Sequence, residues 1–301
     1  MNAKPLNLLF IPIVALLVPI LILIILLIIY ALTTANWMSH EPVFSVKSSL
    51  NISYPNWMSN LYDDTPLYKL SIPGTHDTAA LYGTAFCETQ AMDITDQLDA
   101  GIRSLDLRLY GKDNELQLCH AMIPQFQSFE TALTKINSFL KSHPSEFVIS
   151  RVKEDYDSSN CTKSFSEMVS DTYARVGIPV IVYDQSLTVG SCRSKFVQLP
   201  LKGTFSQCAL QDDYNIDSTF TIDDKKKSVK NHFQKSITDD QSTQLYMNYC
   251  SASSNVLKVT PAEVAKQVNS TVLDYKGKLG VVMLDFPSAA IIQHIINQNF
   301  N

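Results

Sequence analysis

The stretch Ser71–Asp77 reads SIPGTHD and closes a short run of alternating apolar residues. The alternation predicts a strand, and Pro73-Gly74 predicts a break in it. Glycine lets the backbone turn sharply and pass close to a ligand. The break would present His76, whose imidazole is well matched to proton transfer near neutral pH. Taken alone, a His-Asp pair in a loop is more often an ordinary turn than a functional site, so the interpretation depends on the rest of the chain.

Charged and imidazole side chains stand at similar places in four later segments. GIRSLDLRLY predicts a strand with Asp106 and Arg108 on one face, because side chains alternate along a strand. ELQLCHA predicts the next strand, with His120 at its end, and FVISRVKED places Lys153 near the end of another. The run LGVVMLDF is typical of a strand buried on both faces, and it ends in Asp285. A buried acid there needs a partner.

This shared location at strand ends predicts the architecture. In an α/β barrel, the C-terminal ends of the strands converge on one mouth, where active sites are built. Helical patterns lie between the predicted strands: Ser128 and Ser288 each precede an amphipathic stretch, and Thr260-Pro261 opens a third with a capping box. We therefore expect one α/β barrel of roughly 230 residues, slightly shorter than usual. A doubly wound open sheet is the alternative, but no glycine-rich phosphate loop follows the first strand.

Seven motifs, in order, resemble the bacterial phosphatidylinositol-specific phospholipase C family with its X-type catalytic barrel. They cover the chain from about Leu67 to the C-terminus: SIPGTHD, LDLR, the His after LQLC, ISRVKED, QDDY, LYMNYCSASS and LGVVMLDFP. The resemblance implies a distorted, incompletely closed TIM barrel. It also implies a phospholipase C that cleaves phosphatidylinositol or glycosyl-phosphatidylinositol anchors to diacylglycerol and inositol 1,2-cyclic phosphate.

The chemistry of that cleavage fits the same residues. Attack by an internal hydroxyl needs a base, an acid on the leaving oxygen and positive charge at the phosphoryl oxygens. The resemblance implies that His76 is the general base, His120 the general acid and Arg108 the phosphate ligand. It implies further that Asp77 assists and that Asp285 hydrogen-bonds His76, as a third group orients the base in other triads.

Three more residues match family positions that bind the head group: Lys153, and Asp212 and Tyr214 in QDDY, where the tyrosine could stack on the inositol ring. The alternative is that Lys153 and its neighbour Arg151 are solvated charges, and that QDDY is a charged surface loop. The run DDKKK, Asp223–Lys227, predicts a solvated loop.

We expect no cofactor and no calcium requirement. Arg108 holds the position from which a cation would act, and a guanidinium supplies the same sign of charge without coordinating a metal. A glycerophosphodiester phosphodiesterase on a similar barrel is the first alternative, and it would need metal-binding carboxylates and an external water. An inactive barrel that only binds inositol lipid or glycan is the second.

The N-terminal residues predict a membrane anchor. Leu8–Leu32 is 25 residues long without a charge, and about 20 apolar residues suffice to cross a bilayer. A cleavable signal peptide has an apolar region of only about 7–15 residues. We expect a cytoplasmic stub and transmembrane helix over 1–36, a stalk over 37–65 and the catalytic barrel over 66–301. The barrel would lie extracellular or lumenal, or be secreted if the N-terminal segment is cleaved.

Composition excludes some partners. Without Lys4 the formal net charge falls from −5 to −6, so no basic field draws the barrel to nucleic acid or anionic lipid. Capture at a bilayer would instead use apolar rim residues, for which LYGTAF and AMIPQF supply Tyr82, Phe86, Ile123 and Phe126. The alternative for these four is packing against barrel helices. We expect a monomer.

All six cysteines lie beyond the apolar segment, and an even number in an exported domain predicts disulfides without choosing their pairing. No Cys/His spacing suggests zinc. Sequons at Asn51, Asn160 and Asn269 are compatible with glycosylation.

Overall fold

The computed structural model describes residues 18–26, 52–201, 207–254 and 259–300. The chain divides into two compact units, Met1–His40 and Glu41–Asn301. In the first unit, residues 18–26 are helical and their side chains are exposed. No helix within the described ranges is long and apolar enough to cross a bilayer. Most of the predicted anchor, Leu8–Leu32, lies outside the described residues.

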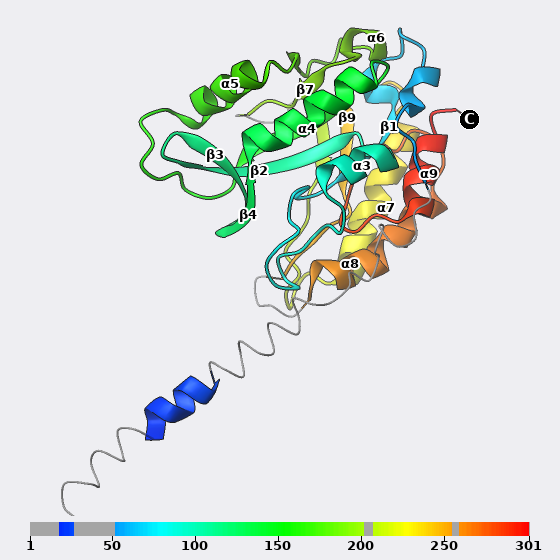
Figure 1. Cartoon of the computed structure of the whole chain (residues 1–301). Helices are drawn as coiled ribbons and strands as arrows, with labels where there is room; N and C mark the ends of the chain where they lie inside the picture. Colours follow the sequence, from blue (N-terminus) through cyan, green and yellow to red (C-terminus); the bar gives the residue numbers. More distant parts are fainter. Residues whose placement is uncertain (1–17, 27–51, 202–206, 255–258, 301) are drawn as a thin grey trace, which may run out of the picture. The chain divides into compact units, whose positions relative to one another are not determined.

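The second unit is built on a sheet of parallel strands that curls into a half-barrel (Figure 1). These strands are β1 (Ser71–Thr75), β2 (Ser104–Lys112), β5 (Val148–Glu154), β6 (Val180–Val182), β7 (Phe196–Gln198), β8 (Cys208–Gln211), β9 (Leu245–Tyr249) and β10 (Gly280–Leu284).

The order of these strands is β6-β7-β5-β2-β1-β10-β9-β8, and each neighbouring pair is parallel. Within the described part of the chain, the edge strands β6 and β8 do not pair with each other, so the barrel is incompletely closed, as predicted. The strand order also departs from that of a regular barrel, because β7 lies between β5 and β6 and not after β6. A side-chain contact reaches across the opening, where Gln207 accepts a hydrogen bond from the backbone of Gln185 (2.8 Å).

An antiparallel hairpin extends from β2. Strand β2 is nine residues long, and β3 (Glu115–His120) returns along it with Leu109 opposite Leu118. Strand β4 (Ile123–Ser128) then pairs with β3. This differs from the predicted arrangement in two ways. Arg108 lies in the middle of β2, and His120 comes from an antiparallel strand that carries it back to the level of Arg108.

Helices cover the convex face of the sheet. They are α3 (Ile94–Ala100), α4 (Phe129–Ser142), α5 (Phe165–Val176), α6 (Val189–Cys192), α7 (Ile222–Thr238), α8 (Pro261–Val268) and α9 (Ala289–Asn297), with the 3-10 helices η1 (Trp57–Asn60), η2 (Leu67–Lys69) and η3 (Asn269–Asp274). In Figure 1, α4 and α5 lie along one flank and α7, α8 and α9 along the other. The predicted starts are confirmed: Ser128 caps α4, Thr260 forms the capping box of α8, and Ser288 is the N-cap residue of α9.

Strand β1 runs straight through Pro73-Gly74, so the predicted break is wrong. Gly74 is needed for close packing: a Cβ there would lie 2.6 Å from the sulfur of Met283 and 2.8 Å from the Cβ of Ser104. The absence of a side chain therefore lets β1 fit between β2 and β10. The chain turns three residues later, at Asp77, which adopts φ of 44°.

The segment 37–65 was predicted to be a stalk outside the barrel, but its described part, 52–65, belongs to the domain. Residues 52–65 pack on the barrel, and Trp57 and Met58 are buried in its core. At the N-terminal ends of the strands, the fully buried Arg103 pairs with Glu146 at 2.9 Å. Arg103 also donates to carbonyl oxygens of this segment, and Glu146 accepts from the backbone of Met58. The segment is thus part of the domain.

The structure changes the predictions for disulfides and for one glycosylation site. All six cysteines are free, so the predicted disulfides are wrong. Asn269 is buried, and its side-chain amide donates to the carbonyl oxygen of Asp285 (2.8 Å), so this sequon does not present an acceptor. Asn160 is exposed, and Asn51 lies outside the described residues.

Candidate active site

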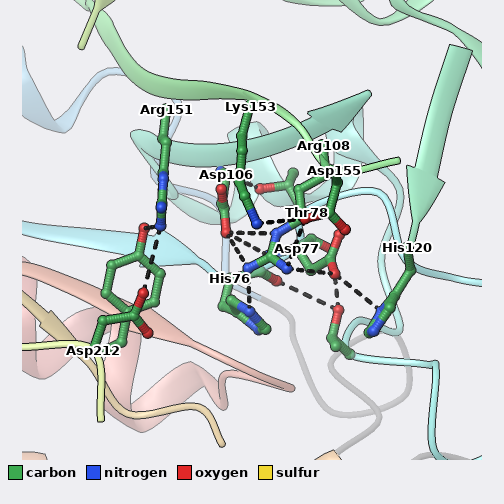
Figure 2. A network of polar contacts seen from close by, with 12 residues as sticks. His76, Asp77, Thr78, Asp106, Arg108, His120, Arg151, Lys153, Asp155 and Asp212 are labelled. Atoms are coloured by element: carbon green, nitrogen blue, oxygen red, sulfur yellow. Dashed lines mark hydrogen bonds and ion pairs between the residues drawn. The ribbon is translucent and has the colours of Figure 1, made fainter. Parts of the chain in front are cut away.

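A pocket of about 250 Å³ lies at the C-terminal ends of the parallel strands. Six of the eight predicted site residues line it: His76, Arg108, His120, Lys153, Asp212 and Tyr214. The other two are in contact with the histidines. Asp285 lies beside His76, and Asp77 lies beside His120. The structure therefore brings all eight together, and Figure 2 shows the two histidines on either side of Arg108.

The pairing of β2 with β5 brings three cationic side chains and one acid together on one wall of the pocket. Asp106 is in register with Arg151, and Arg108 is in register with Lys153. Because alternate residues of a strand share a face, these four side chains stand in two rows on the concave side. Each row holds a side chain from β2 next to one from β5.

His76 follows directly after β1, and its two ring nitrogens have different partners. Nδ1 lies 2.8 Å from Oδ1 of Asp285, which follows β10. Nε2 lies 2.7 Å from Nη2 of Arg108. A guanidinium can only donate, so Nε2 accepts and the ring proton is on Nδ1, donated to Asp285. This tautomer places the basic lone pair on the nitrogen that faces the pocket.

The surroundings of His76 keep it neutral. Burial lowers its pKa well below the ordinary value, and the nearby charge of Arg108 lowers it further. Burial raises the pKa of Asp285, which makes that carboxylate a better acceptor for the Nδ1 proton. A neutral imidazole with an oriented lone pair is what a general base requires.

His120 has the opposite character. Its Nδ1 lies 2.9 Å from Oδ2 of Asp77. Burial would lower the pKa of His120, but the Asp77 carboxylate outweighs burial, and the pKa is raised. His120 therefore favours the protonated form, which suits a proton donor. Two imidazoles near one guanidinium thus have pKa values displaced in opposite directions.

Arg108 is held by three carboxylates. Its Nη2 lies 3.0 Å from Asp106, and its Nη1 lies 3.6 Å from both Asp77 and Asp155. Burial opposes the charge, yet these acids raise the pKa of Arg108 well above its ordinary value. The guanidinium is permanently charged. In the described ranges, no three His, Cys, Asp or Glu side chains form a group suited to a metal ion.

Asp155 joins three parts of the site and was missed in the sequence. Its Oδ1 pairs with Lys153 and approaches Arg108, and its Oδ2 accepts from the backbone of Ala121 (2.9 Å). Ala121 has φ of 47° and directly follows His120. Asp155 therefore orients Lys153 and fixes the turn that follows His120. Asp155 directly follows β5, and its i, i+2 spacing from Lys153 was a readable signal.

The segment that contains Asp212 and Tyr214 is held by hydrogen bonds from the buried Lys225. Lys225 belongs to helix α7 and is fully buried, so the predicted solvated loop at 223–227 is wrong. Its ammonium donates to the side chain of Gln211 and to the carbonyl oxygen of Asp213. Burial lowers its pKa to about 8. Lys225 thereby holds the residues on both sides of Asp212 in place.

Two of the predicted rim residues are exposed. Tyr82 is 52% and Phe126 81% exposed, and their rings meet edge to face at 5.4 Å. Gln125 links the two segments, because its side chain accepts from the backbone of Tyr82 (3.0 Å). Phe86 and Ile123 are half-buried. The exposed pair belongs to the loop after β1 and to strand β4 of the hairpin that presents His120.

Comparison with known proteins gives matches over most of the chain. The family profile described as PI-PLC X 1 matches residues 66–184. The 1-phosphatidylinositol phosphodiesterase of Listeria monocytogenes is 31% identical over 284 residues, covering 83% of this chain and 86% of that protein. The human PI-PLC X domain-containing protein 1 is 36% identical over 130 residues, which is 31% of this chain and 40% of that protein.

Solved structures agree with the fold. The phosphatidylinositol-specific phospholipase C from Listeria monocytogenes superposes with a TM-score of 0.70 at 27% identity, covering 82% of this chain and 99% of that one. A Staphylococcus aureus phosphatidylinositol-specific phospholipase C gives a TM-score of 0.72 at 23% identity, covering 82% and 98%. The second likeness concerns the fold alone.

Proposed function

The chain belongs to the phosphatidylinositol-specific phospholipase C family, and we propose that its pocket cleaves phosphatidylinositol or glycosyl-phosphatidylinositol anchors without a metal ion. The observation that carries the proposal is the pair of imidazoles with opposite pKa shifts, set on either side of one half-buried guanidinium. Two titratable groups whose surroundings push their pKa values apart are typical of a base and an acid acting together.

The proposed reaction has one covalent exchange at phosphorus. Nε2 of His76 takes the proton of the inositol 2-hydroxyl, and that oxygen attacks the phosphorus. The bond from phosphorus to the glycerol oxygen breaks, and His120 protonates the departing oxygen. The products are diacylglycerol and inositol 1,2-cyclic phosphate. Arg108 stabilises the negative charge that develops on the phosphoryl oxygens, while Asp285 steadies the imidazolium formed at His76.

Substrate binding is assigned to the remaining predicted residues. Lys153, Asp212 and Tyr214 line the pocket beyond Arg108 and would contact the inositol ring. The exposed pair Tyr82 and Phe126 would rest against the lipid surface, which suits a substrate whose acyl chains stay in a bilayer. The 1-phosphatidylinositol phosphodiesterase of Listeria monocytogenes supports the choice of lipid.

We also propose that the apolar segment Leu8–Leu32 takes the domain to the outer side of a membrane. Fractionation of cells that express the full chain tests this placement. Recovery of the protein from the cytosolic fraction would contradict it.

The decisive experiment is an assay of the purified full-length protein on phosphatidylinositol vesicles with excess chelator. We expect diacylglycerol and inositol 1,2-cyclic phosphate, and no products from matched phosphatidylcholine vesicles, because that head group lacks an internal hydroxyl at the reacting position. Loss of activity in chelator would favour the glycerophosphodiester phosphodiesterase alternative. Binding of inositol lipid without any cleavage would favour the inactive barrel.

The pH dependence tests the division of roles. His76 must be neutral and His120 protonated, so kcat/KM should fall below the pKa of His76 and above that of His120. Asp77→Asn removes the carboxylate that raises the pKa of His120. The alkaline limb of the profile should therefore move to lower pH, while the acidic limb stays. An alkaline limb that does not move would remove His120 from the role of acid.

A further inference from the structure

Arg151 is a pocket residue to which the reaction described above gives no role. It comes from β5, in register with Asp106 of β2, one row deeper than Lys153. Its side chain is 18% exposed and lines the same pocket as both histidines. Figure 2 shows it standing apart from the group around Arg108 and reaching toward Asp212. The interpretation of Arg151 as a solvated charge is therefore wrong.

The contacts of Arg151 cross the half-barrel. Its Nη1 donates to the hydroxyl of Tyr249 at 3.2 Å, and the same nitrogen lies 3.5 Å from Oδ2 of Asp212. Asp212 follows β8, the strand at the far edge of the sheet from β5 and β7. The guanidinium and the carboxylate thus approach each other over the concave face, where a ligand enters.

Tyr249 relates this pair to the reacting centre. Its ring packs against that of His76 in a T-shaped arrangement with centroids 5.9 Å apart, and its hydroxyl accepts the hydrogen bond from Arg151. The ring of Tyr249 therefore lies between His76, the proposed base, and the guanidinium of Arg151. A six-membered polyol with one hydroxyl at His76 would direct the hydroxyls of its other edge toward Arg151 and Asp212.

We propose that Arg151 and Asp212 together bind neighbouring hydroxyls of a cyclic polyol head group, and that Arg151 is a specificity-determining residue of this chain. The inference rests on the proposed function and names a further residue for the same site. Each hydroxyl both donates and accepts. A carboxylate accepts from such a pair and a guanidinium donates to it, so opposite charges side by side match a diol better than either charge alone.

The charge of Arg151 is available at every working pH. Burial opposes it, but Tyr249, Asp106 and Asp212 raise its pKa above the ordinary value. A hydrogen bond from a charged group is stronger than one between neutral groups. Losing it should weaken head-group binding by about 10- to 100-fold.

The test uses the full chain and myo-inositol as the probe. Arg151→Met should raise KM for phosphatidylinositol and the inhibition constant of myo-inositol by about 10- to 100-fold, with kcat changed only a few-fold. The matched control is Arg175→Met, because Arg175 lies on α5 and its ion pairs among the described residues are with the surface acids Glu115 and Glu130. That variant should leave both constants unchanged.

Two further measurements keep the outcome clear. Arg151→Lys keeps the charge but loses the planar fork, and it should fall between wild type and Arg151→Met even if the latter folds poorly. Thermal stabilisation by myo-inositol reports binding without turnover, so it separates this inference from the proposed reaction. An unchanged myo-inositol constant, or a loss confined to kcat, would overturn the assignment. Weaker myo-inositol binding by a wild-type-like fold would support it even in a chain that cleaves nothing.

Discussion

Replacing His76 or His120 by alanine is expected to lower kcat on phosphatidylinositol by about 10²–10⁴-fold, because each variant removes one of the two proposed proton transfers. The double variant should be little slower than the worse single variant, since both groups serve one transition state. Turnover is measured as release of water-soluble inositol phosphate from vesicles. Head-group affinity should change far less, because Lys153, Asp212 and Tyr214 remain in place.

The matched control is His294→Ala. His294 lies on α9 and contacts the carbonyl oxygen of Tyr275, away from the pocket. We expect wild-type turnover from that variant. Turnover within a few-fold of wild type in His76→Ala would remove the acid-base mechanism, whatever the fold.

Glu146→Leu is expected to lower the free energy of unfolding by about 3–5 kcal/mol, since it leaves the guanidinium of Arg103 buried without its counter-charge. Burial already lowers the pKa of Arg103 to about 10, which reflects how poorly that site tolerates a charge. The variant also removes the acceptor for the backbone of Met58. Urea denaturation followed by circular dichroism measures the change.

The control for this prediction is Glu130→Gln, which breaks an exposed ion pair with Arg175. Surface pairs contribute about 0–1 kcal/mol, so the control should shift the urea midpoint only slightly. The folded fraction of Glu146→Leu should retain kcat, because the pair lies at the N-terminal ends of the strands, opposite the pocket. Equal midpoints for the two variants would show that the buried pair has no special weight.

Much of the site followed from local pattern. Alternation put Asp106 and Arg108 on one face, and the apolar run before Asp285 placed that acid at a strand end, as observed. The capping residues of α4 and α8 were visible because they act within four residues of the helix start. These features depend on short-range geometry, which a single sequence contains.

The features that the sequence did not predict depend mostly on contacts between residues far apart in the chain. Alternation does not distinguish a parallel strand from an antiparallel one, so the return of β3 toward Arg108 could not be predicted. The role of Gly74 depends on Met283 and Ser104, which are distant in sequence. Lys225 is different. Val229 and Phe233 follow it by four and eight residues, and this helical spacing could have revealed that it faces inward.

The contact between Arg108 and Nε2 of His76 has a consequence for the resting protein. One lone pair accepts one hydrogen, and at 2.7 Å the guanidinium already occupies it. In the proposed reaction, a hydroxyl would reach that nitrogen once the arginine turns from it toward the phosphate. In the unliganded chain, the nitrogen proposed to activate the hydroxyl therefore already has a hydrogen-bond donor. In the proposed mechanism, binding of the phosphate would therefore precede activation of the hydroxyl.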